Sequence, residues 1–247
     1  DRTPILPLGI RVADTEGGMG YMIEQSLQNR LGSEKIDRRV VTLITQMLID
    51  MDDPSLQNPT KFIGQFYTEE EARRWETERG WTMKLDSKRG WRRVVPSPIP
   101  TRVINAEVIK ELVNKGHIVI AAGGGGIPVY IDHRGYYEGF DAVIDKDLGS
   151  AVLANEIGAD TLCILTAVDN VAINFGTPDE KKLEEVTVSE LEDYLCAGHF
   201  PPGSMGPKVK AAIQFIRNGG RQVVITSLEN AHAAAHGTAG TRIRPDK

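Results

Sequence analysis

Short apolar runs rich in β-branched residues alternate along this chain with segments whose apolar residues recur at helical spacing. This alternation constrains the fold strongly, because strands that take turns with helices become parallel neighbours joined by crossover connections. The pattern predicts strands at residues 40–49, 117–122, 161–166 and 223–226, and helices at 18–31, 69–79, 106–114, 150–157, 188–197, 209–217 and 229–235. We therefore predict an α/β fold with a mostly parallel sheet and helices on both faces.

Residues 52–100 differ in character from the rest of the chain. They contain all three tryptophans (Trp75, Trp81 and Trp91), a charged helix-like segment, and an exit punctuated by three prolines. An excursion of this length is uncommon as a plain surface loop in a compact domain. We predict an inserted subdomain here, within a single domain that covers residues 1–247.

Composition limits the classes of partner. The net charge is −5, so nothing in the overall balance favours nucleic acid or an anionic membrane surface. Two cysteines are too few for a disulfide framework, which favours a reducing, cytoplasmic setting. No apolar run is long enough to span a bilayer, and the five histidines show no metal-ligand spacing, so no membrane partner and no protein-bound metal are expected.

Four consecutive glycines, Gly123, Gly124, Gly125 and Gly126, follow one of the predicted strands. Backbone without side chains at a strand end brings several N–H groups close to an anion, although a flexible turn is the simpler alternative. The spacing does not fit the Rossmann fingerprint, and no Gly-Lys-Ser/Thr occurs for a Walker loop. Any phosphate chemistry must therefore use another architecture.

Three lysines are candidates for phosphoryl transfer, which mainly needs positioning and charge neutralisation. Lys146 lies between Asp145 and Asp147, where the chain leaves an apolar run, although Asp147 alone would serve as a helix cap. Lys208 opens a predicted helix, where a cation is disfavoured unless an anion binds there. Lys61 is the weakest candidate, since a loop lysine is usually just exposed.

Six motifs in order along the chain resemble the carbamate kinases of the amino acid kinase superfamily. They are Asn-Pro-Thr-Lys-Phe-Ile-Gly at 58–64, Gly-Trp-Arg-Arg-Val-Val-Pro-Ser-Pro at 90–98, Gly-Gly-Gly-Gly-Ile-Pro at 123–128, Ala-Val-Ile-Asp-Lys-Asp at 142–147, Ala-Gly-His-Phe-Pro-Pro-Gly-Ser-Met-Gly-Pro-Lys at 197–208, and Gly-Thr-Arg-Ile at 240–243. The resemblance covers essentially the whole chain. It implies a three-layer α/β/α sandwich with a small lid subdomain, 52–100, and usually a homodimer.

The same resemblance implies reversible phosphoryl transfer between ATP and carbamate, giving ADP and carbamoyl phosphate with Mg²⁺, often run towards ATP in arginine or purine breakdown. Lys146 and Lys208 would then stabilise the transferring phosphoryl group, Asp147 would organise both lysines, and Lys61 would reach in from the lid. The glycine turn would line the carbamate side. The residues implied near the nucleotide are Thr166, Ala167, Val168, Asp169, Met205, Gly206 and Pro207.

Two departures from the family pattern matter. The chain begins inside that pattern and lacks the two glycine turns that precede this point, so we expect a missing segment, because a central strand without its neighbour leaves backbone groups unpaired. Residues 14–18 read Asp-Thr-Glu-Gly-Gly where many relatives carry an uncharged Met-Thr-Gln or Met-Ser-Gln stretch. Two alternatives therefore stay open: a kinase of this fold acting on another small carboxylic acid, and a non-catalytic nucleotide-binding fragment.

Overall fold

The computed structural model describes residues 6–86 and 89–246, which fall into two compact units. The N-terminal unit contains the described residues up to Ile104 together with His117–Asp145. The C-terminal unit contains Asn105–Gly116 together with the described residues from Lys146 onward. The chain thus passes from one unit to the other between Asp145 and Lys146, inside the charged motif singled out in the sequence.

The N-terminal unit is built on short strands whose parallel pairs carry the glycine turn. Strand β1 pairs in parallel with β7, and β2 pairs in parallel with β8, while β6 and β9 add antiparallel neighbours. The bounds are β1 Val40–Thr42, β2 Gln46–Ile49, β6 Pro100–Val103, β7 Ile118–Ile120, β8 Ile127–Ile131 and β9 Tyr137–Gly139. The glycine turn therefore connects β7 to β8, and each of these strands pairs with one half of the predicted strand 40–49.

The predicted strand at residues 40–49 is two strands rather than one. The break falls at residues 43–45, where the Thr45 hydroxyl donates a hydrogen bond to the carbonyl of Leu43 and the chain changes its partner from β7 to β8. A side chain that satisfies a backbone group competes with the ladder of a sheet. The β-branched run predicts the strand type correctly but cannot show this change of partner.

Helix α1, Leu8–Ser33, begins ten residues before the predicted start at Gly18 and packs on β1 and β8. Its glycines allow this contact: a Cβ on Gly20 would lie 2.2 Å from the Cγ2 of Thr42. Glycine weakens a helix interior by about 1 kcal/mol, so the glycines at 9, 17 and 18 make the first part of this helix hard to predict from the sequence pattern. Tertiary packing stabilises the helix instead.

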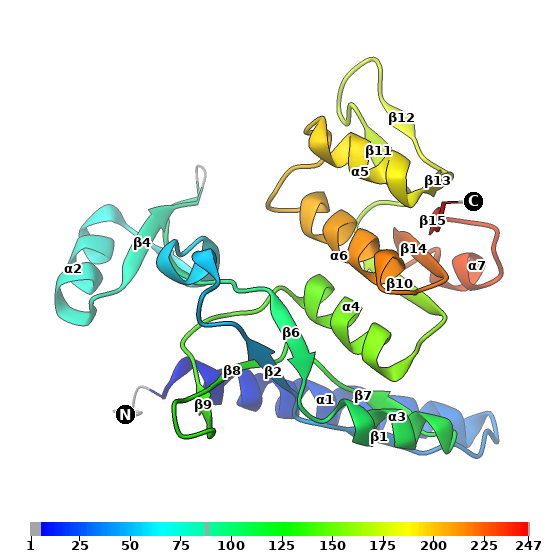
Figure 1. Ribbon diagram of the computed structural model, residues 1–247, viewed down its shortest axis with the longest axis horizontal. Coiled ribbons are helices and arrows are strands. Elements are labelled where there is room, and N and C mark those ends of the chain that lie inside the picture. Colours follow the sequence, from blue (N-terminus) through cyan, green and yellow to red (C-terminus); the bar gives the residue numbers. More distant parts are fainter. Residues whose placement is uncertain (1–5, 87–88, 247) are drawn as a thin grey trace. The chain divides into compact units, whose positions relative to one another are not determined.

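A small antiparallel sheet with one helix occupies part of the predicted subdomain. Its strands are β3 Lys61–Tyr67, β4 Thr82–Leu85 and β5 Trp91–Val95, in the order β3-β5-β4, with a short 3₁₀ turn, η1 Pro54–Gln57, before them. Helix α2, Glu69–Arg79, starts at a capping box between Thr68 and Glu71 and stops at Gly80, whose φ of 64° is left-handed. In Figure 1 this helix lies beside β4. The rings of Trp75 and Trp81 pack 5.4 Å apart between helix and sheet.

The C-terminal unit has a four-stranded sheet in the order β10-β14-β15-β13. Strand β10 runs parallel to β14, and β13 runs parallel to β15. The bounds are α3 Ala106–Asn114, α4 Lys146–Ile157, β10 Thr161–Thr166, β11 Ala172–Ile173, β12 Lys181–Lys182, β13 Glu185–Thr187, α5 Val188–Cys196, α6 Met205–Arg217, β14 Gln222–Ser227, α7 Ala231–Ala235 and β15 Thr241–Arg244. Helices α4 and α6 lie side by side in Figure 1, and one apolar core links them to β10 and β14.

Cys163, inside the predicted strand 161–166, is exposed and does not belong to the core. Leu162 and Ile164 are buried in the core, whereas Cys163 and Leu165 are exposed. Successive side chains of a strand point to opposite faces, so an apolar run on β10 places only every second residue in this core.

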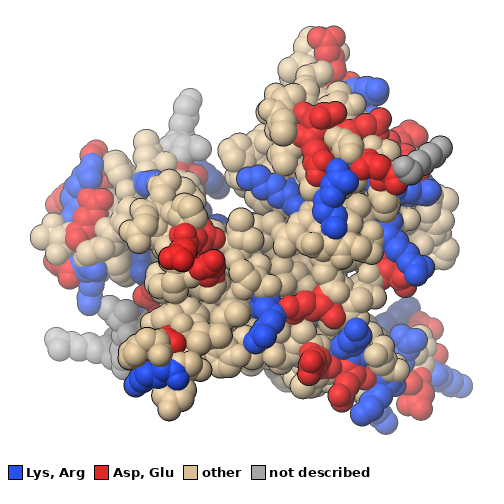
Figure 2. Space-filling view, viewed as in Figure 1, with Lys and Arg blue, Asp and Glu red and all other residues tan. Residues whose placement is uncertain are grey.

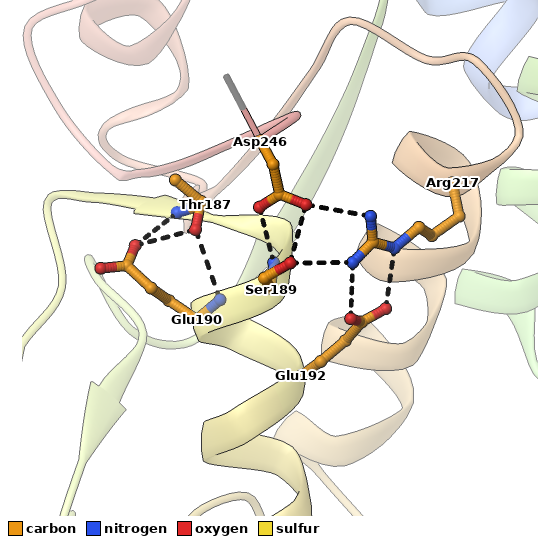
Figure 3. A network of polar contacts seen from close by, with 6 residues as sticks. All are labelled: Thr187, Ser189, Glu190, Glu192, Arg217 and Asp246. Atoms are coloured by element: carbon orange, nitrogen blue, oxygen red, sulfur yellow. Dashed lines mark hydrogen bonds and ion pairs between the residues drawn. The ribbon is translucent and has the colours of Figure 1, made fainter.

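A polar network ties the start of α5 to the end of α6 (Figure 3). Thr187 and Glu190 form a capping box at the first turn of α5. Arg217, on α6, reaches two carboxylates, Glu192 at 2.6 Å and Asp246 at 3.0 Å, and these partners raise the pKa of its guanidinium. The network therefore holds the C-terminal end of the described chain against both helices.

Candidate functional site

The buried pair of Asp147 and Lys208 is the centre of the candidate site in the C-terminal unit. Asp147 lies in the first turn of α4, and Lys208 lies in the first turn of α6. The Lys208 ammonium donates a hydrogen bond to Asp147 Oδ2 over 2.9 Å, and the two side chains are only 12% and 8% exposed. An ion pair this far from water keeps both charges only when the geometry is good, so the pair fixes the position of each partner.

Lys146 lies beside this pair but points more to solvent. Its Nζ is 3.9 Å from the same Asp147 oxygen, and its side chain is 58% exposed. One carboxylate oxygen thus faces two ammonium groups. In this geometry Asp147 holds Lys208 by a hydrogen bond, whereas Lys146 stays accessible to solvent.

Both lysines belong to the first turn of a helix, where free backbone N–H groups create positive potential. Ser204 at the start of α6 makes no side-chain cap hydrogen bond. Gly206 is required there because a Cβ would lie 2.9 Å from the carbonyl oxygen of Pro201. Two cations and two neighbouring helix starts against one aspartate leave positive charge that a bound anion would neutralise.

Lys61 forms the second lysine–aspartate pair, and this one lies in the N-terminal unit. Its Nζ lies 2.7 Å from Asp145 Oδ2, with the lysine 34% and the aspartate 10% exposed. Lys61 is the first residue of β3, and Asp145 ends the N-terminal unit. Local sequence does not show that Lys61 and Asp145 pair, because the two residues are 84 positions apart.

The glycine turn has an unusual backbone that only glycine adopts easily. Gly123, Gly125 and Gly126 have φ values of 26°, 135° and 85°. A Cβ on Gly126 would lie 2.4 Å from the Cγ of Met47, so there is no space for a side chain there. Among the described residues no acceptor is found for the N–H groups of Gly123 and Gly124, and both glycines are exposed. These N–H groups are free to face an anion.

A hollow of about 410 Å³ opens at the edge of the C-terminal unit's sheet. In the wall of this hollow, Asn230 donates a hydrogen bond to Asp169 Oδ1 over 2.8 Å. The hollow is lined by Asp169, Asn170, Glu184, Glu185, Asn230, Thr238, Ala239, Gly240 and Arg242. Figure 2 shows acidic side chains gathered near α5 and β13, in this part of the unit. Carboxylates and amides suit the hydroxyl and amino groups of a nucleoside better than its phosphates.

Of the residues predicted near a nucleotide, Asp169 lines this hollow. Thr166, Ala167 and Val168 precede it on the same connection, while Met205, Gly206 and Pro207 form the start of α6 beside the lysine pair and do not line it. Sequence reasoning missed Asn230 and Glu184. The register of β10 and β14, with Thr166 opposite Ser227, brings both strand ends to one rim, so the residues after β14 could have been suspected.

Comparison with known proteins identifies the class. The model of the amino acid kinase family matches residues 61–227, about two thirds of the chain. The chain therefore belongs to the amino acid kinase family.

Similar proteins of known name narrow the class to one branch. A carbamate kinase of Pyrococcus horikoshii is 50% identical over 98% of this chain and 77% of its own length. A carbamate kinase-like protein of Escherichia coli is 46% identical over 97% of this chain and 76% of its own length. A solved structure of carbamate kinase from Giardia lamblia bound to AMP-PNP superposes with a TM-score of 0.91, at 43% identity, over 99% of this chain and 77% of that one. These relatives confirm the predicted fold and group the chain with the carbamate kinases.

Proposed function

We propose that this protein is a carbamate kinase, which transfers a phosphoryl group reversibly between ATP and carbamate. The observation that carries the proposal is the buried Asp147–Lys208 pair with Lys146 beside it, in a chain 50% identical to a carbamate kinase. The acceptor supplies the attacking oxygen, a carbamate oxygen in one direction and an ADP phosphate oxygen in the other, so the protein need not provide a nucleophile. A transferring phosphoryl group chiefly needs positive charge and correct alignment.

In this proposal Lys208 and Lys146 stabilise the negative charge of the transferring phosphoryl group. Lys208 is nearly immobile because Asp147 holds it, so it offers a fixed charge without reorganisation at the moment of reaction. Lys146 is more exposed and can follow the phosphoryl group between donor and acceptor. The first turns of α4 and α6 add backbone N–H groups to the same anion site. Asp147 acts as the positioning group for both lysines.

We assign the nucleoside of ATP or ADP to the hollow lined by Asp169 and Asn230, with Met205, Gly206 and Pro207 near the phosphates. The relative bound to AMP-PNP supports a nucleotide as a ligand of this fold. Mg²⁺ enters with the nucleotide, because this ion keeps several waters and is commonly held by substrate phosphates. Within the part of the chain that the structure describes, no group of three or more His, Cys, Asp or Glu side chains could hold a metal ion.

We assign carbamate, or the carbamoyl end of carbamoyl phosphate, to Gly123, Gly124, Gly125 and Gly126. The free N–H groups of the first two glycines are suitable donors to a small carboxylate. Lys61 is the third cation in the proposal and comes from the lid, residues 52–100. Its partner Asp145 keeps it oriented until an anion competes for the ammonium.

Several features of the cellular setting belong to the same proposal. We infer a homodimer, because α1 exposes Met19, Tyr21, Met22 and Ile23, each 47% exposed or more. We infer a cytoplasmic location, since Cys163 and Cys196 are free thiols. We also infer a role in arginine or purine breakdown, in which transfer from carbamoyl phosphate to ADP yields ATP. Separately, no helix among the described residues is long and apolar enough to cross a membrane.

A second candidate is a kinase of this fold that acts on another small carboxylic acid. The observation that favours it is Glu16, an acidic side chain buried directly beside the glycine turn. A carboxyl group at that position changes the charge around the acceptor, and charge decides which small acids bind. The chemical class of the acceptor is therefore the property that an experiment must determine.

The test is ATP formation from ADP, Mg²⁺ and an acyl phosphate by the purified chain. Carbamoyl phosphate, acetyl phosphate and the acyl phosphate of an amino acid side chain are compared at equal concentrations. The proposal expects carbamoyl phosphate to give the highest kcat/KM. A higher kcat/KM for another acyl phosphate would replace carbamate by that acid, and nucleotide binding without turnover of any donor would contradict catalysis.

A further inference from the structure

The structure contains a buried carboxyl group that the phosphoryl-transfer chemistry does not use. Glu16, on α1, is 5% exposed, and its Oε1 has no hydrogen-bond partner among the described residues. Its Oε2 accepts a hydrogen bond from the backbone N–H of Thr45 over 2.9 Å. Acidic side chains are almost never buried this deeply without full pairing, so this position calls for an explanation.

The close packing of α1 brings Glu16 against the glycine turn. Gly20 lets the helix approach β1, and one turn earlier the Glu16 side chain reaches Gly123. A Cβ on Gly123 would lie 2.5 Å from Glu16 Cγ and 3.2 Å from Oε1. The carboxyl group therefore lies directly beneath the first glycine of the turn.

Thr45, the partner of Glu16, holds both ends of that turn. Its hydroxyl accepts a hydrogen bond from the N–H of Ala122 over 2.8 Å, just before the turn. Its carbonyl accepts one from the N–H of Ile127 over 2.8 Å, just after the turn. Thr45 is completely buried, so these bonds do not compete with water. A displacement of Thr45 would move both ends of the turn together.

We propose that Glu16 is a positioning residue of the acceptor site, which fixes the glycine turn through the Thr45 N–H and must be uncharged when an anion occupies the turn. This inference rests on the proposed function, because it takes the glycine turn as the site for carbamate or carbamoyl phosphate. An ionised, unpaired Oε1 beneath Gly123 repels an anion above it. Binding of the acceptor anion and ionisation of Glu16 therefore oppose one another.

The surroundings of Glu16 offer little charge to offset its ionisation. Residues 43–45, the glycine turn and β2 contain no titratable side chain, and β8 contributes only Tyr130. On α1 itself the titratable side chains nearest along the chain are Asp14, Arg11 and Tyr21. Burial raises the pKa of the Glu16 carboxyl, with the Thr45 N–H opposing the rise. Both the geometry and the lack of nearby positive charge therefore favour an uncharged Glu16 when an anion is bound.

The experiment measures KM for carbamoyl phosphate and KM for ADP, separately, in the parent, E16A, E16Q and L31A. Leu31 is a buried residue of the same helix, about four turns away, and controls for a general loosening of α1. In E16A we expect KM for carbamoyl phosphate to rise about tenfold while KM for ADP stays unchanged, and in L31A neither value should change. E16Q keeps an acceptor for the Thr45 N–H, so it should retain the parent's KM at low pH.

The pH profile distinguishes a positioning role of Glu16 from a purely structural role, in which the side chain only fills space. The ratio of KM for carbamoyl phosphate in the parent to that in E16Q should rise with increasing pH, by about tenfold per pH unit once Glu16 is ionised. An unchanged KM in E16A, or an equal rise in both KM values, would overturn the inference. If E16A does not fold, a KM ratio that is independent of pH would overturn it. A parent that forms no ATP at all would instead overturn the proposed function on which the inference rests.

Discussion

Lys208 donates a hydrogen bond to Asp147 from a position that is almost closed to solvent, and the two residues come from the first turns of two neighbouring helices. A lysine at the positive end of a helix is unfavourable by itself, and the aspartate compensates for it. Fixing a cation where an anion is to bind is the kind of preorganised charge that phosphoryl transfer requires. The proposed catalysis depends on this pair.

Breaking the Asp147–Lys208 pair should destabilise the protein as well as inactivate it. K208A removes the buried ammonium that donates a hydrogen bond to Asp147, and breaking a buried ion pair from one side costs about 3–5 kcal/mol of unfolding free energy. The double variant D147N/K208M removes both charges and should recover most of that stability but none of the activity. Urea unfolding monitored by circular dichroism measures both variants. Equal urea midpoints for parent and K208A would contradict a structural role for the pair.

Glycine is required at position 126 and not at position 124, so the two alanine variants should differ in stability. G126A places a Cβ against Met47 at a left-handed φ, and we expect a loss of about 2–4 kcal/mol of unfolding free energy. No atom lies within 4 Å of a Cβ on Gly124, so G124A should unfold at nearly the same urea concentration as the parent. Thermal or urea unfolding decides this, and equal losses in both variants would contradict the turn geometry.

Glu16 should make the stability of the parent depend on pH in a direction opposite to that of most carboxylates. Burial raises the pKa of Glu16 in the folded protein. Its contribution to the unfolding free energy is therefore fully present below the pKa of a glutamate in the unfolded chain, about 4.3, and is lost as pH rises through the folded pKa. The unfolding free energy of the parent minus that of E16Q should therefore fall as pH rises from 4 to 8. A difference that stays constant would show that Glu16 titrates normally.

Asp86, beside the small sheet β3-β5-β4, should make stability depend on pH in the opposite direction to Glu16. Hydrogen bonds from Arg92, and then from Arg89, lower the pKa of its carboxyl. A lowered folded pKa gives stability that is present above the usual pKa and lost as pH falls through the folded value. Because all three tryptophans lie in residues 52–100, their fluorescence reports this region. Acidification should change the fluorescence at a higher pH in D86N than in the parent, and coincident curves would contradict the assigned role.

Much of the fold and part of the candidate site could be predicted from local sequence. The strand at 161–166 and the helix at 106–114 have the predicted bounds, because their periodicity and their glycine stops are local signals. Lys146, Asp147 and Lys208 could be named because each lies where a helix starts after an apolar run or a turn. These signals need no knowledge of distant contacts.

The features that escaped prediction depend on contacts between distant segments. Asp145 pairs with Lys61 across 84 positions, and nothing in either motif shows that the two side chains meet. Glu16 looks like a surface residue of a helix until the packing of α1 on the glycine turn buries it. The exposure of Cys163 could not be predicted, because an apolar strand does not show which of its faces meets the core.

The most direct test of the central claim is ATP formation from ADP, Mg²⁺ and carbamoyl phosphate by the parent and by K146A under identical conditions. Lys146 is exposed, so its loss should leave the fold and the binding of ADP unchanged, which circular dichroism and calorimetry check. The account predicts ATP from the parent and a kcat lower by about a hundredfold or more in K146A. No ATP from a correctly folded parent, or equal rates from both proteins, would contradict it.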